Sequence, residues 1–241
     1  MELDDELRAK DPARIAGMFD AIAARYDFLN HLLSAGIDRY WRARAIRSLR
    51  LTGRETLLDL CTGTGDLAIA AAAPRRAARV VGLDFAAAML HVGQEKVARA
   101  GLARRVRLLR GDAMRIPLAA ASVDAVTIAF GIRNVADPAA ACRDIHRVLR
   151  PAGRLAILEF GLPRAPVVRS LYLWYFRHVL PRIGRLVSRH TAAYDYLPAS
   201  VGAFPPPETF AGVLRAAGFA DVAVSPLTFG IVYLYSGTVA P

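Results

Sequence analysis

The stretch TLLDLCTGTGDL, residues 56–67, limits the folds open to this chain more than any other. Residues 56–60 have the apolar pattern of a short buried strand, and Gly63 and Gly65 interrupt it before a helical run that starts at Asp66. We expect the Asp66 side chain to cap that helix. A strand, a glycine turn and a helix N-terminus form a nucleotide cradle, because the backbone can approach a ligand closely there.

The acidity of this loop favours one class of ligand. Gly63, Gly65 and Ala68 fit the relaxed dinucleotide fingerprint, which is a weak pattern on its own. Asp59 and Asp66 would meet a pyrophosphate with two carboxylates, which is electrostatically unfavourable. S-adenosylmethionine (SAM) has no phosphate, and its ammonium and sulfonium groups are positive. The loop therefore favours SAM, while a tight turn without a ligand stays the alternative.

Strands and helices alternate after the glycine loop. The pattern predicts further strands at residues 79–83, 106–109, 123–130 and 154–160. It predicts helices between them at residues 86–100 and 138–149. This rhythm is typical of an α/β fold with a doubly wound, mostly parallel sheet, which binds ligands at the carboxyl ends of its strands.

Helical additions surround this core within one predicted domain, residues 1–241. We expect a helical N-terminal arm, the SAM-binding core, a helical insertion or lid, and a closing helix and strands, at residues 1–50, 51–161, 162–205 and 206–241. Within the arm we expect a helix over residues 14–25, and a second over 39–49 capped by Asp38. The closing part is predicted to hold a helix at 207–217 and a β pair at 222–224 and 231–235.

The chain is strongly basic, with a net charge of +11 and a pI near 10.4. Such a balance suggests an anionic partner, either nucleic acid or an anionic membrane surface, or it simply keeps the surface soluble. The predicted insertion holds arginines at 169, 177, 182, 185 and 189 among the aromatic residues Tyr172, Trp174, Tyr175 and Phe176. These aromatic residues either enter a membrane interface or form the core of a lid.

Cys61 and Cys142 are the only cysteines, and they make neither a disulfide framework nor a metal cluster. We therefore expect a reducing, cytoplasmic setting and no metal site. The N-terminus, MELDDELRAKD, lacks an apolar signal segment, and no apolar run is long enough for a transmembrane helix.

Acidic residues follow the second and third predicted strands as well. Asp84 stands about 20 residues after the glycines, where a carboxylate reaches a ribose diol, although it is equally placed to cap the next helix. Asp112, with the backbone N–H of Ala113, is placed to read the edge of adenine. Acids after three successive strands, beginning with Asp59, indicate a SAM-dependent methyltransferase.

Several further motifs occur in an order that strengthens this interpretation. They include YDFLN at 26–30, FGIRN at 130–134, RVLRPAG at 147–153 and YDYLP at 194–198. Over nearly its whole length the chain resembles the UbiE/MenG quinone C-methyltransferases, class I SAM-dependent enzymes with a Rossmann-like fold. Cys61 departs from a broader SAM pattern that has glycine there, Ala152 replaces a usual glycine of the family, and Tyr235 replaces a common histidine.

The resemblance implies a set of cofactor-binding residues: Asp59, Gly63, Thr64, Gly65, Asp84, Asp112, Ala113 and Ala129, the last through its backbone. The implied reaction is SAM-dependent C-methylation of a prenylated quinol ring, demethylmenaquinol to menaquinol. The alternative acceptor is 2-methoxy-6-polyprenyl-1,4-benzoquinol of ubiquinone synthesis. The protein would be cytoplasmic, at the inner face of the membrane, and a homo-oligomer is left open.

Candidate catalytic residues follow from position. Arg133 is placed to stabilise a phenolate, or only to brace its loop through Glu159 or Asp137, and Asp27, His31 or Tyr194 to accept or relay a proton. Alignment of the reacting atoms alone is the alternative source of rate. A nucleic-acid methyltransferase is disfavoured because its catalytic motif is missing after the fourth strand, so no nucleic-acid partner is expected. The acidic loop disfavours an NAD oxidoreductase.

Overall fold

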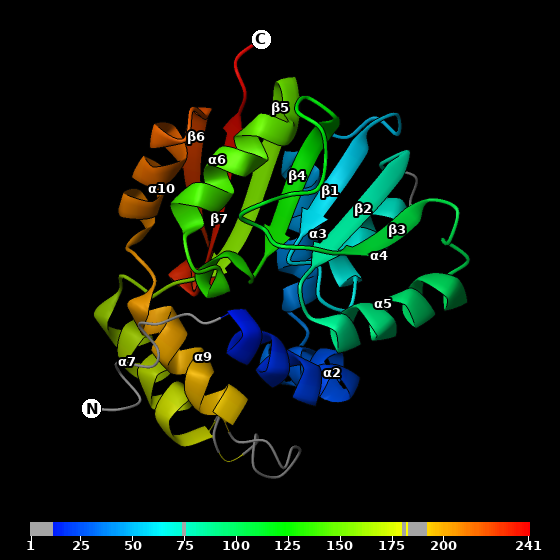
Figure 1. Ribbon diagram of the computed structural model, residues 1–241. Coiled ribbons are helices and arrows are strands. Elements are labelled where there is room, and N and C mark those ends of the chain that lie inside the picture. Colours follow the sequence, from blue (N-terminus) through cyan, green and yellow to red (C-terminus); the bar gives the residue numbers. More distant parts are fainter. Residues whose placement is uncertain (1–11, 74–75, 180–181, 183–191) are drawn as a thin grey trace.

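Seven strands form one sheet in the order β3-β2-β1-β4-β5-β7-β6 (Figure 1). The computed structural model describes residues 12–73, 76–179, 182 and 192–241. The strands are β1 Thr56–Leu60, β2 Arg79–Asp84, β3 Val106–Arg110, β4 Val123–Ala129, β5 Leu149–Phe160, β6 Ala220–Leu227 and β7 Val232–Thr238. Strands β1 to β5 pair in parallel, and β7 runs antiparallel between β5 and β6. The predicted doubly wound, mostly parallel sheet is confirmed.

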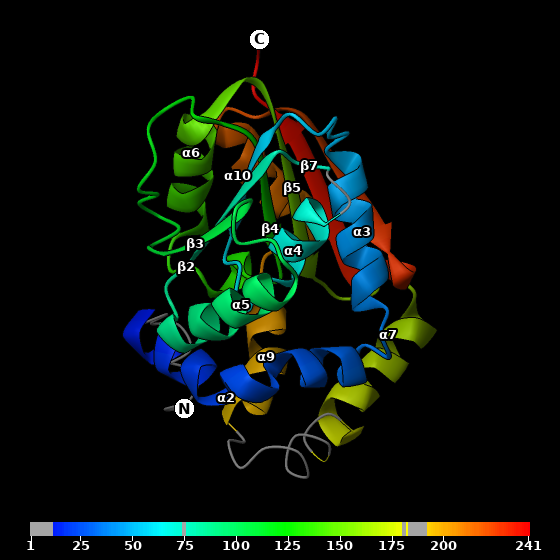
Figure 2. The ribbon, with the colours of Figure 1, turned by 90° about the vertical axis from the view of Figure 1, so that its right-hand side faces the viewer.

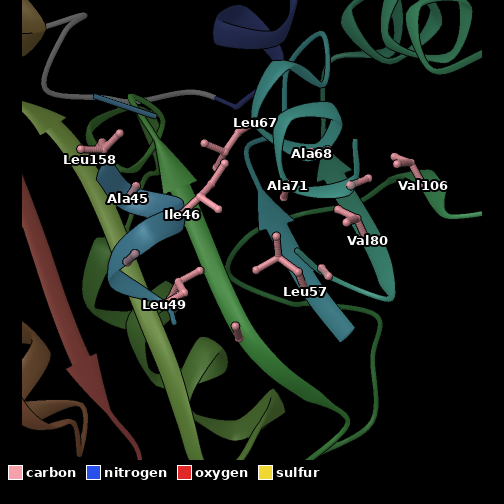
Figure 3. Packing of buried hydrophobic residues seen from close by; sticks show 14 of the residues in the cluster. Ala45, Ile46, Leu49, Leu57, Leu67, Ala68, Ala71, Val80, Val106 and Leu158 are labelled. Atoms are coloured by element: carbon pink, nitrogen blue, oxygen red, sulfur yellow. The ribbon is translucent and has the colours of Figure 1, made fainter. Parts of the chain in front are cut away.

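Helices cover both faces of the sheet (Figure 2). One face carries α3 Asp38–Ser48, α4 Asp66–Ala72 and α5 Ala87–Arg99, and the other carries α6 Pro138–Val148 and α10 Pro207–Ala216. Side chains alternate along β1, so Leu57 belongs to one core with Ile46 (Figure 3), and Leu58 belongs to a second core, which also contains Phe210. The sheet is therefore buried on both sides.

Three helices lie beyond the carboxyl ends of the parallel strands (Figure 1). They are α2 Pro12–Leu33, α7 Pro166–Trp174 and α9 Ala192–Ala203, and a π-helical turn, Tyr175–Val179, extends α7. Two short 3-10 turns, Ile132–Asn134 and Thr228–Gly230, follow β4 and β6. The arm helix is longer than the predicted 14–25. Of the predicted insertion, residues 180–181 and 183–191 lie outside the described residues, with Arg185 and Arg189 among them.

Some predicted boundaries are displaced. Leu149 begins β5 and pairs with Val123 rather than ending α6. The closing strands β6 and β7 are each longer than predicted because they pair along most of their length. These changes leave the order of the elements as predicted.

The predictions that Asp66 and Asp38 cap their helices are wrong. Each is the first residue of its helix, and neither the α3 nor the α4 cap has a side-chain hydrogen bond. Gly65, with φ of +80°, precedes α4. The two carboxylates bind cations instead, Asp66 the ammonium of Lys96 at 2.5 Å and Asp38 the guanidinium of Arg42. A charged partner outcompetes a backbone N–H for these acids.

Ala152 has a φ of +59°, in the left-handed region that favours glycine because a Cβ crowds the backbone there. The side chain is exposed, so its removal loses no packing. We expect Ala152→Gly to raise the free energy of unfolding by about 0.5–1 kcal/mol. Ala98→Gly, on the exposed face of α5, is the matched control and should lower it by about 1 kcal/mol. Urea titration measures both, and an equal loss in the two variants would contradict the expectation.

Asp59 is a buried acid whose ionisation should make stability depend on pH. Burial raises the pKa of this carboxyl from 3.8 to about 6, although hydrogen bonds from Thr62 and Thr127 oppose the rise. Between about pH 4 and pH 6 the folded state thus keeps a proton that the unfolded chain has lost. The contribution of Asp59 to the free energy of unfolding therefore falls as the pH rises through this range.

Asp59→Asn removes this titration and keeps the shape of the side chain. From pH 5 to pH 7 the variant should gain about 1 kcal/mol of unfolding free energy relative to the parent protein. Urea titrations at the two pH values, without added ligand, measure the difference. A constant difference between the two proteins would show that Asp59 stays ionised across this range.

Candidate functional site

Two adjoining cavities open at the carboxyl ends of the parallel strands. The smaller encloses about 130 Å³ and brings together five predicted cofactor-binding residues: Gly63, Asp84, Asp112, Ala113 and Ala129. They lie at the carboxyl ends of four different strands, or just after them. They meet because parallel strands end at the same edge of the sheet. Among the described residues, no lysine or arginine lines this cavity.

Asp84 connects the glycine loop to the turn after β2. One carboxylate oxygen accepts the Gly63 N–H at 2.7 Å, and the other accepts the Ala86 N–H at 2.9 Å. Burial raises the pKa of Asp84, against these backbone donors. Because α5 begins at Ala87, the bond to Ala86 shapes the turn before the helix. Each oxygen keeps further acceptor capacity toward the cavity.

The rest of this lining suits a flat, neutral ring. Leu83, Phe85, Met89 and Met114 supply apolar surface. Asp112 is exposed, accepts the N–H of Met114 at 2.8 Å and lies next to buried Ala113. A cavity with two carboxylates, apolar walls and no lining cation in the described chain fits a nucleoside without phosphate. The residues present therefore fit SAM better than a dinucleotide.

The other three predicted cofactor residues do not line either cavity. Asp59 lies beneath the loop and accepts hydrogen bonds from Thr62 at 2.6 Å and Thr127 at 2.9 Å. Gly65 begins the turn into α4, and the buried Thr64 hydroxyl donates to Asp27 at 2.5 Å. These contacts fix the shape of the loop, and direct contact with a cofactor stays a prediction for all three.

Backbone strain is concentrated where β1 and β4 end. Cys61 and Phe130 have φ of +54° and +61°, values that side chains other than glycine rarely adopt. A Cβ on Gly131 would stand 2.3 Å from the Cβ of Cys61. Cys61 thus adopts the backbone conformation that favours the glycine of the broader pattern, and Gly131 leaves it the space.

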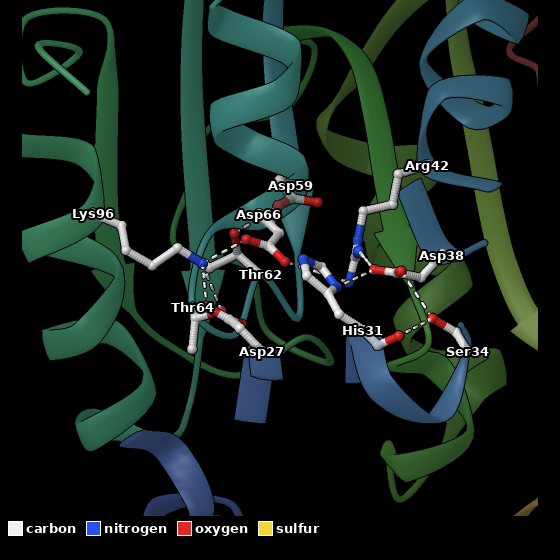
Figure 4. A network of polar contacts seen from close by, with 10 residues as sticks. All are labelled: Asp27, His31, Ser34, Asp38, Arg42, Asp59, Thr62, Thr64, Asp66 and Lys96. Atoms are coloured by element: carbon white, nitrogen blue, oxygen red, sulfur yellow. Dashed lines mark hydrogen bonds and ion pairs between the residues drawn. The ribbon is translucent and has the colours of Figure 1, made fainter. Parts of the chain in front are cut away.

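A network of charges joins the arm to the loop (Figure 4). Lys96 on α5 reaches the carboxylates of Asp27 on α2 and Asp66 on α4, both at 2.5 Å. Arg42 on α3 lies 3.6 Å from Asp66 and also pairs with buried Asp38. Burial would raise the pKa of Asp38, but Arg42 and neighbouring hydrogen bonds outweigh it and the pKa is lowered. Four helices are thereby held together over the glycine turn.

The larger cavity encloses about 500 Å³ between α2, α3, α7 and α9. Its inner wall is aromatic: Phe130 and Phe160 stack with centroids 4.5 Å apart, and Trp41 meets them edge-on at 5.8 and 6.2 Å. Trp41 is 4% exposed and donates to Thr228 at 2.8 Å, so it belongs to the core. It is at the same time a cavity wall.

Tyr26 connects the two spaces. Together with Phe19 and Phe130 it lines both cavities. Desolvation by burial raises the pKa of its hydroxyl, so it is neutral at physiological pH. Tyr26 therefore forms part of the wall between the two cavities.

Arg133 is a buried cation in the wall of the larger cavity. It donates to Glu159 at 2.7 Å, to the carbonyl of Phe130 at 2.5 Å and to Ser200 at 3.2 Å. Burial opposes its charge, but the Glu159 carboxylate outweighs burial and raises the pKa. The predicted brace through Glu159 is confirmed, and the guanidinium also lies 5.4 Å from the centre of the Phe160 ring.

The candidate proton acceptors are placed less favourably. Asp27 lines neither cavity, and its two oxygens are held by Thr64 and Lys96. His31 Nδ1 lies 2.8 Å from Asp38, and His31 is also absent from the cavity walls. Tyr194 belongs to α9, but its side chain lies outside the described residues. A catalytic role for each of these three residues stays a prediction.

Some site residues escaped the sequence analysis. Lys96 gave no signal because its acidic partners Asp27 and Asp66 stand 69 and 30 residues away in the chain, whereas the i,i+4 spacing of Asp38 and Arg42 is a local signal that could have found Arg42. Tyr196 lines the larger cavity and donates to Asn134 at 3.0 Å, and only the YDYLP motif pointed to its segment. For Tyr172 the sequence left a membrane interface and the core of a lid as alternatives, and the side chain is 8% exposed because its side of α7 packs against the cavity.

Comparisons with known proteins agree with this geometry. A curated relative from Syntrophotalea carbinolica, named ubiquinone/menaquinone biosynthesis C-methyltransferase UbiE, is 50% identical over 91% of this chain and 92% of its own. A demethylmenaquinone methyltransferase of Thermus thermophilus is 46% identical over 91% of this chain and 99% of its own.

Solved structures show the same fold. A putative S-adenosyl-L-methionine-dependent methyltransferase from Methanococcus maripaludis superposes with a TM-score of 0.64 at 21% identity, over 91% of this chain and 92% of its own. The fold is thus that of the class I SAM-dependent methyltransferases. The model of the ubiE/COQ5 methyltransferase family matches residues 7–239, and the chain belongs to that family.

Proposed function

We propose that this chain transfers the methyl group of SAM to a ring carbon of a prenylated quinol, with demethylmenaquinol as the preferred acceptor. The observation that carries the proposal is the pair of adjoining cavities, one suited to a phosphate-free nucleoside and one apolar and aromatic. The names of the curated relatives support the quinone chemistry. A 2-methoxy-6-polyprenyl-1,4-benzoquinol is the alternative, because the first of those names covers both pathways.

The smaller cavity is where this chain would hold SAM. Asp84 would accept from the ribose diol, Asp112 and the Ala113 N–H would read the adenine edge, and Ala129 would offer its backbone. Bound SAM supplies an electrophilic methyl group. The hydrogen bond from the Gly63 N–H to Asp84 holds the glycine loop in place, so the smaller cavity is formed before any ligand enters.

The larger cavity would orient the acceptor ring. Trp41, Phe130 and Phe160 give it flat apolar walls, and Tyr26 and Phe130 stand where the two ligands would meet. The ring has to be reduced, since a quinol oxygen donates electrons to the ring carbon and a phenolate donates more. The buried guanidinium of Arg133 would stabilise that phenolate, while Glu159 and the Phe130 carbonyl fix its direction.

The methylated carbon must also lose its proton. Asp27 and His31 are engaged elsewhere and do not line the cavity. We therefore assign no essential base and expect alignment of the ring to supply most of the rate. The ring proton would leave through tyrosine hydroxyls or water.

Asp84→Ala should weaken SAM binding by about 2–4 kcal/mol, because two charge-assisted hydrogen bonds to the ribose are lost. Asp112→Ala should weaken it less, since the Ala113 N–H still binds adenine. Calorimetry gives both dissociation constants. Asp84→Asn, which keeps one acceptor for the Gly63 N–H, separates loss of the diol contact from loosening of the loop. An unchanged constant for Asp84→Ala would rule out the ribose role.

Arg133→Lys should lower turnover about tenfold or more while leaving SAM affinity nearly intact. Lysine keeps the charge but loses the planar fork that holds Glu159, Phe130 and Ser200 together. Single-turnover kinetics and SAM calorimetry on the same preparation measure the two effects. A large loss of SAM binding would instead place Arg133 in the cofactor site or in the stability of the fold.

The proposal as a whole is tested in a bacterial strain that lacks this methylation step. Expression of the chain should restore the methylated quinone in the lipid extract, as read by mass spectrometry. The mass of the restored product identifies the naphthoquinol or the benzoquinol acceptor. Restoration of neither quinone, with the protein folded and SAM bound, would refute the proposed substrate. The expected location, in the cytoplasm at the inner face of the membrane, belongs to the same proposal.

A further inference from the structure

Most of the large apolar side chains that remain exposed lie near the larger cavity. In the part of the chain that the structure describes, eight such side chains are between 40% and 81% exposed. Phe28 is on the face of α2 away from the cavity, and we call the other seven the apolar rim: Leu32, Ile37, Tyr40, Val167, Leu171, Trp174 and Phe229. Isolated exposed apolar residues are ordinary, but a contiguous group marks a surface that meets a partner.

These seven side chains lie around the opening of the larger cavity. Ile37, Leu171 and Trp174 line that cavity themselves. Each of the other four is the chain neighbour of a lining residue. They come from the end of α2, the start of α3, α7 and the turn between β6 and β7, and Figure 2 shows α7 beneath α3 on the side toward which α2 runs.

Phe229 is exposed in the rim although its backbone conformation is unfavourable. Its backbone has φ of +58°, which is unfavourable for a bulky residue, and its side chain is 80% exposed. Among the described residues it therefore gains little packing in return for that conformation.

Arginines flank the rim. Arg39, Arg44 and Arg47 are exposed along α3, and Arg169 is exposed on α7. Within the described residues no ion pair joins these four to an acidic side chain. An apolar surface with an aromatic residue at its centre and unpaired cations at its edge is complementary to an anionic lipid interface.

We propose that the apolar rim enters the surface of an anionic lipid bilayer, so that the larger cavity opens directly onto the lipid. This inference rests on the proposed function in one respect: the prenyl tail of the acceptor would stay in the bilayer while the ring enters between α2 and α7. None of the described helices has the length and apolarity needed to cross a membrane.

Tryptophan fluorescence tests the contact directly. The chain has two tryptophans, Trp41 buried in the core and Trp174 in the rim, 54% exposed. Vesicles of phosphatidylcholine with phosphatidylglycerol should shift the emission to shorter wavelength, and lipids brominated on the acyl chain should quench it. Trp174→Phe should abolish both responses. No shift with such vesicles would overturn the proposal.

A triple variant, Leu32→Ser with Val167→Ser and Phe229→Ser, removes rim residues that do not line the cavity and keeps Trp174 as the probe. Vesicle binding should fall about tenfold or more, while methylation of a short-tailed, water-soluble quinol should be unchanged. Equal vesicle binding by parent and variant would overturn the proposal. So would a parent dimer in sedimentation velocity that the variant loses, since the rim would then cover a second copy.

Charge reversal has a matched control. Arg39→Glu with Arg47→Glu should weaken binding to anionic vesicles about tenfold. Arg104→Glu with Arg107→Glu, exposed at β3, changes the net charge equally and should leave binding nearly intact. Equal effects of the two pairs would reduce the contact to net charge and overturn the assigned surface. Vesicle binding without methylation of any quinol would instead refute the proposed substrate and leave the surface standing.

Discussion

Parallel pairing of β1 with β2 and β4 is the constraint on which the site depends. It ends these strands, with β3, at one edge of the sheet, so the glycine loop, Asp84, Asp112 and Ala129 meet there although they are far apart in the chain. Asp84 then joins two of the strand ends through the N–H groups of Gly63 and Ala86. A cofactor site made from strand ends needs a rigid sheet behind it, and the two buried cores supply it.

The arm is attached in a different way. Side chains, rather than sheet hydrogen bonds, fasten α2 to the loop, through Asp27, Thr64 and Lys96, and α3 through Arg42 and Asp38. The Lys96 pairs are partly exposed, so each contributes little and is weakened by salt. Because α2 also walls the larger cavity, these ion pairs help to decide how firmly the roof of the site is closed.

Arg133 and Glu159 are the costliest residues of the site to disturb. Both are buried, and removing one partner would leave an uncompensated charge, which destabilises a protein by about 3–5 kcal/mol. The pair would be a weak choice for stability alone, since apolar residues of similar volume often serve as well. Its position beside Phe130 and Phe160, in the cavity wall, is where the proposed function would need a buried cation to stabilise the phenolate.

The sequence by itself determined the strand-loop-helix of residues 56–67, the order of the strands along the chain, and the choice of SAM over a dinucleotide. These follow from local apolar periodicity and from the sign of the charges near the glycines, which short stretches carry in full. The resemblance of motifs such as FGIRN added the family, and position after the fourth strand made Arg133 a candidate.

Only the tertiary structure decided which distant partners the charged side chains take. Asp66 was predicted to be a cap, but it pairs with Lys96, which stands 30 residues away in the chain, whereas Asp38 pairs with Arg42 at the local i,i+4 spacing. Tyr172 and Trp174 differ by two positions in one aromatic run, yet one is buried in the cavity wall and the other is exposed. The apolar rim likewise comes from four separate elements. Local pattern fixes which face of a segment is apolar, but only the packed fold decides what that face meets.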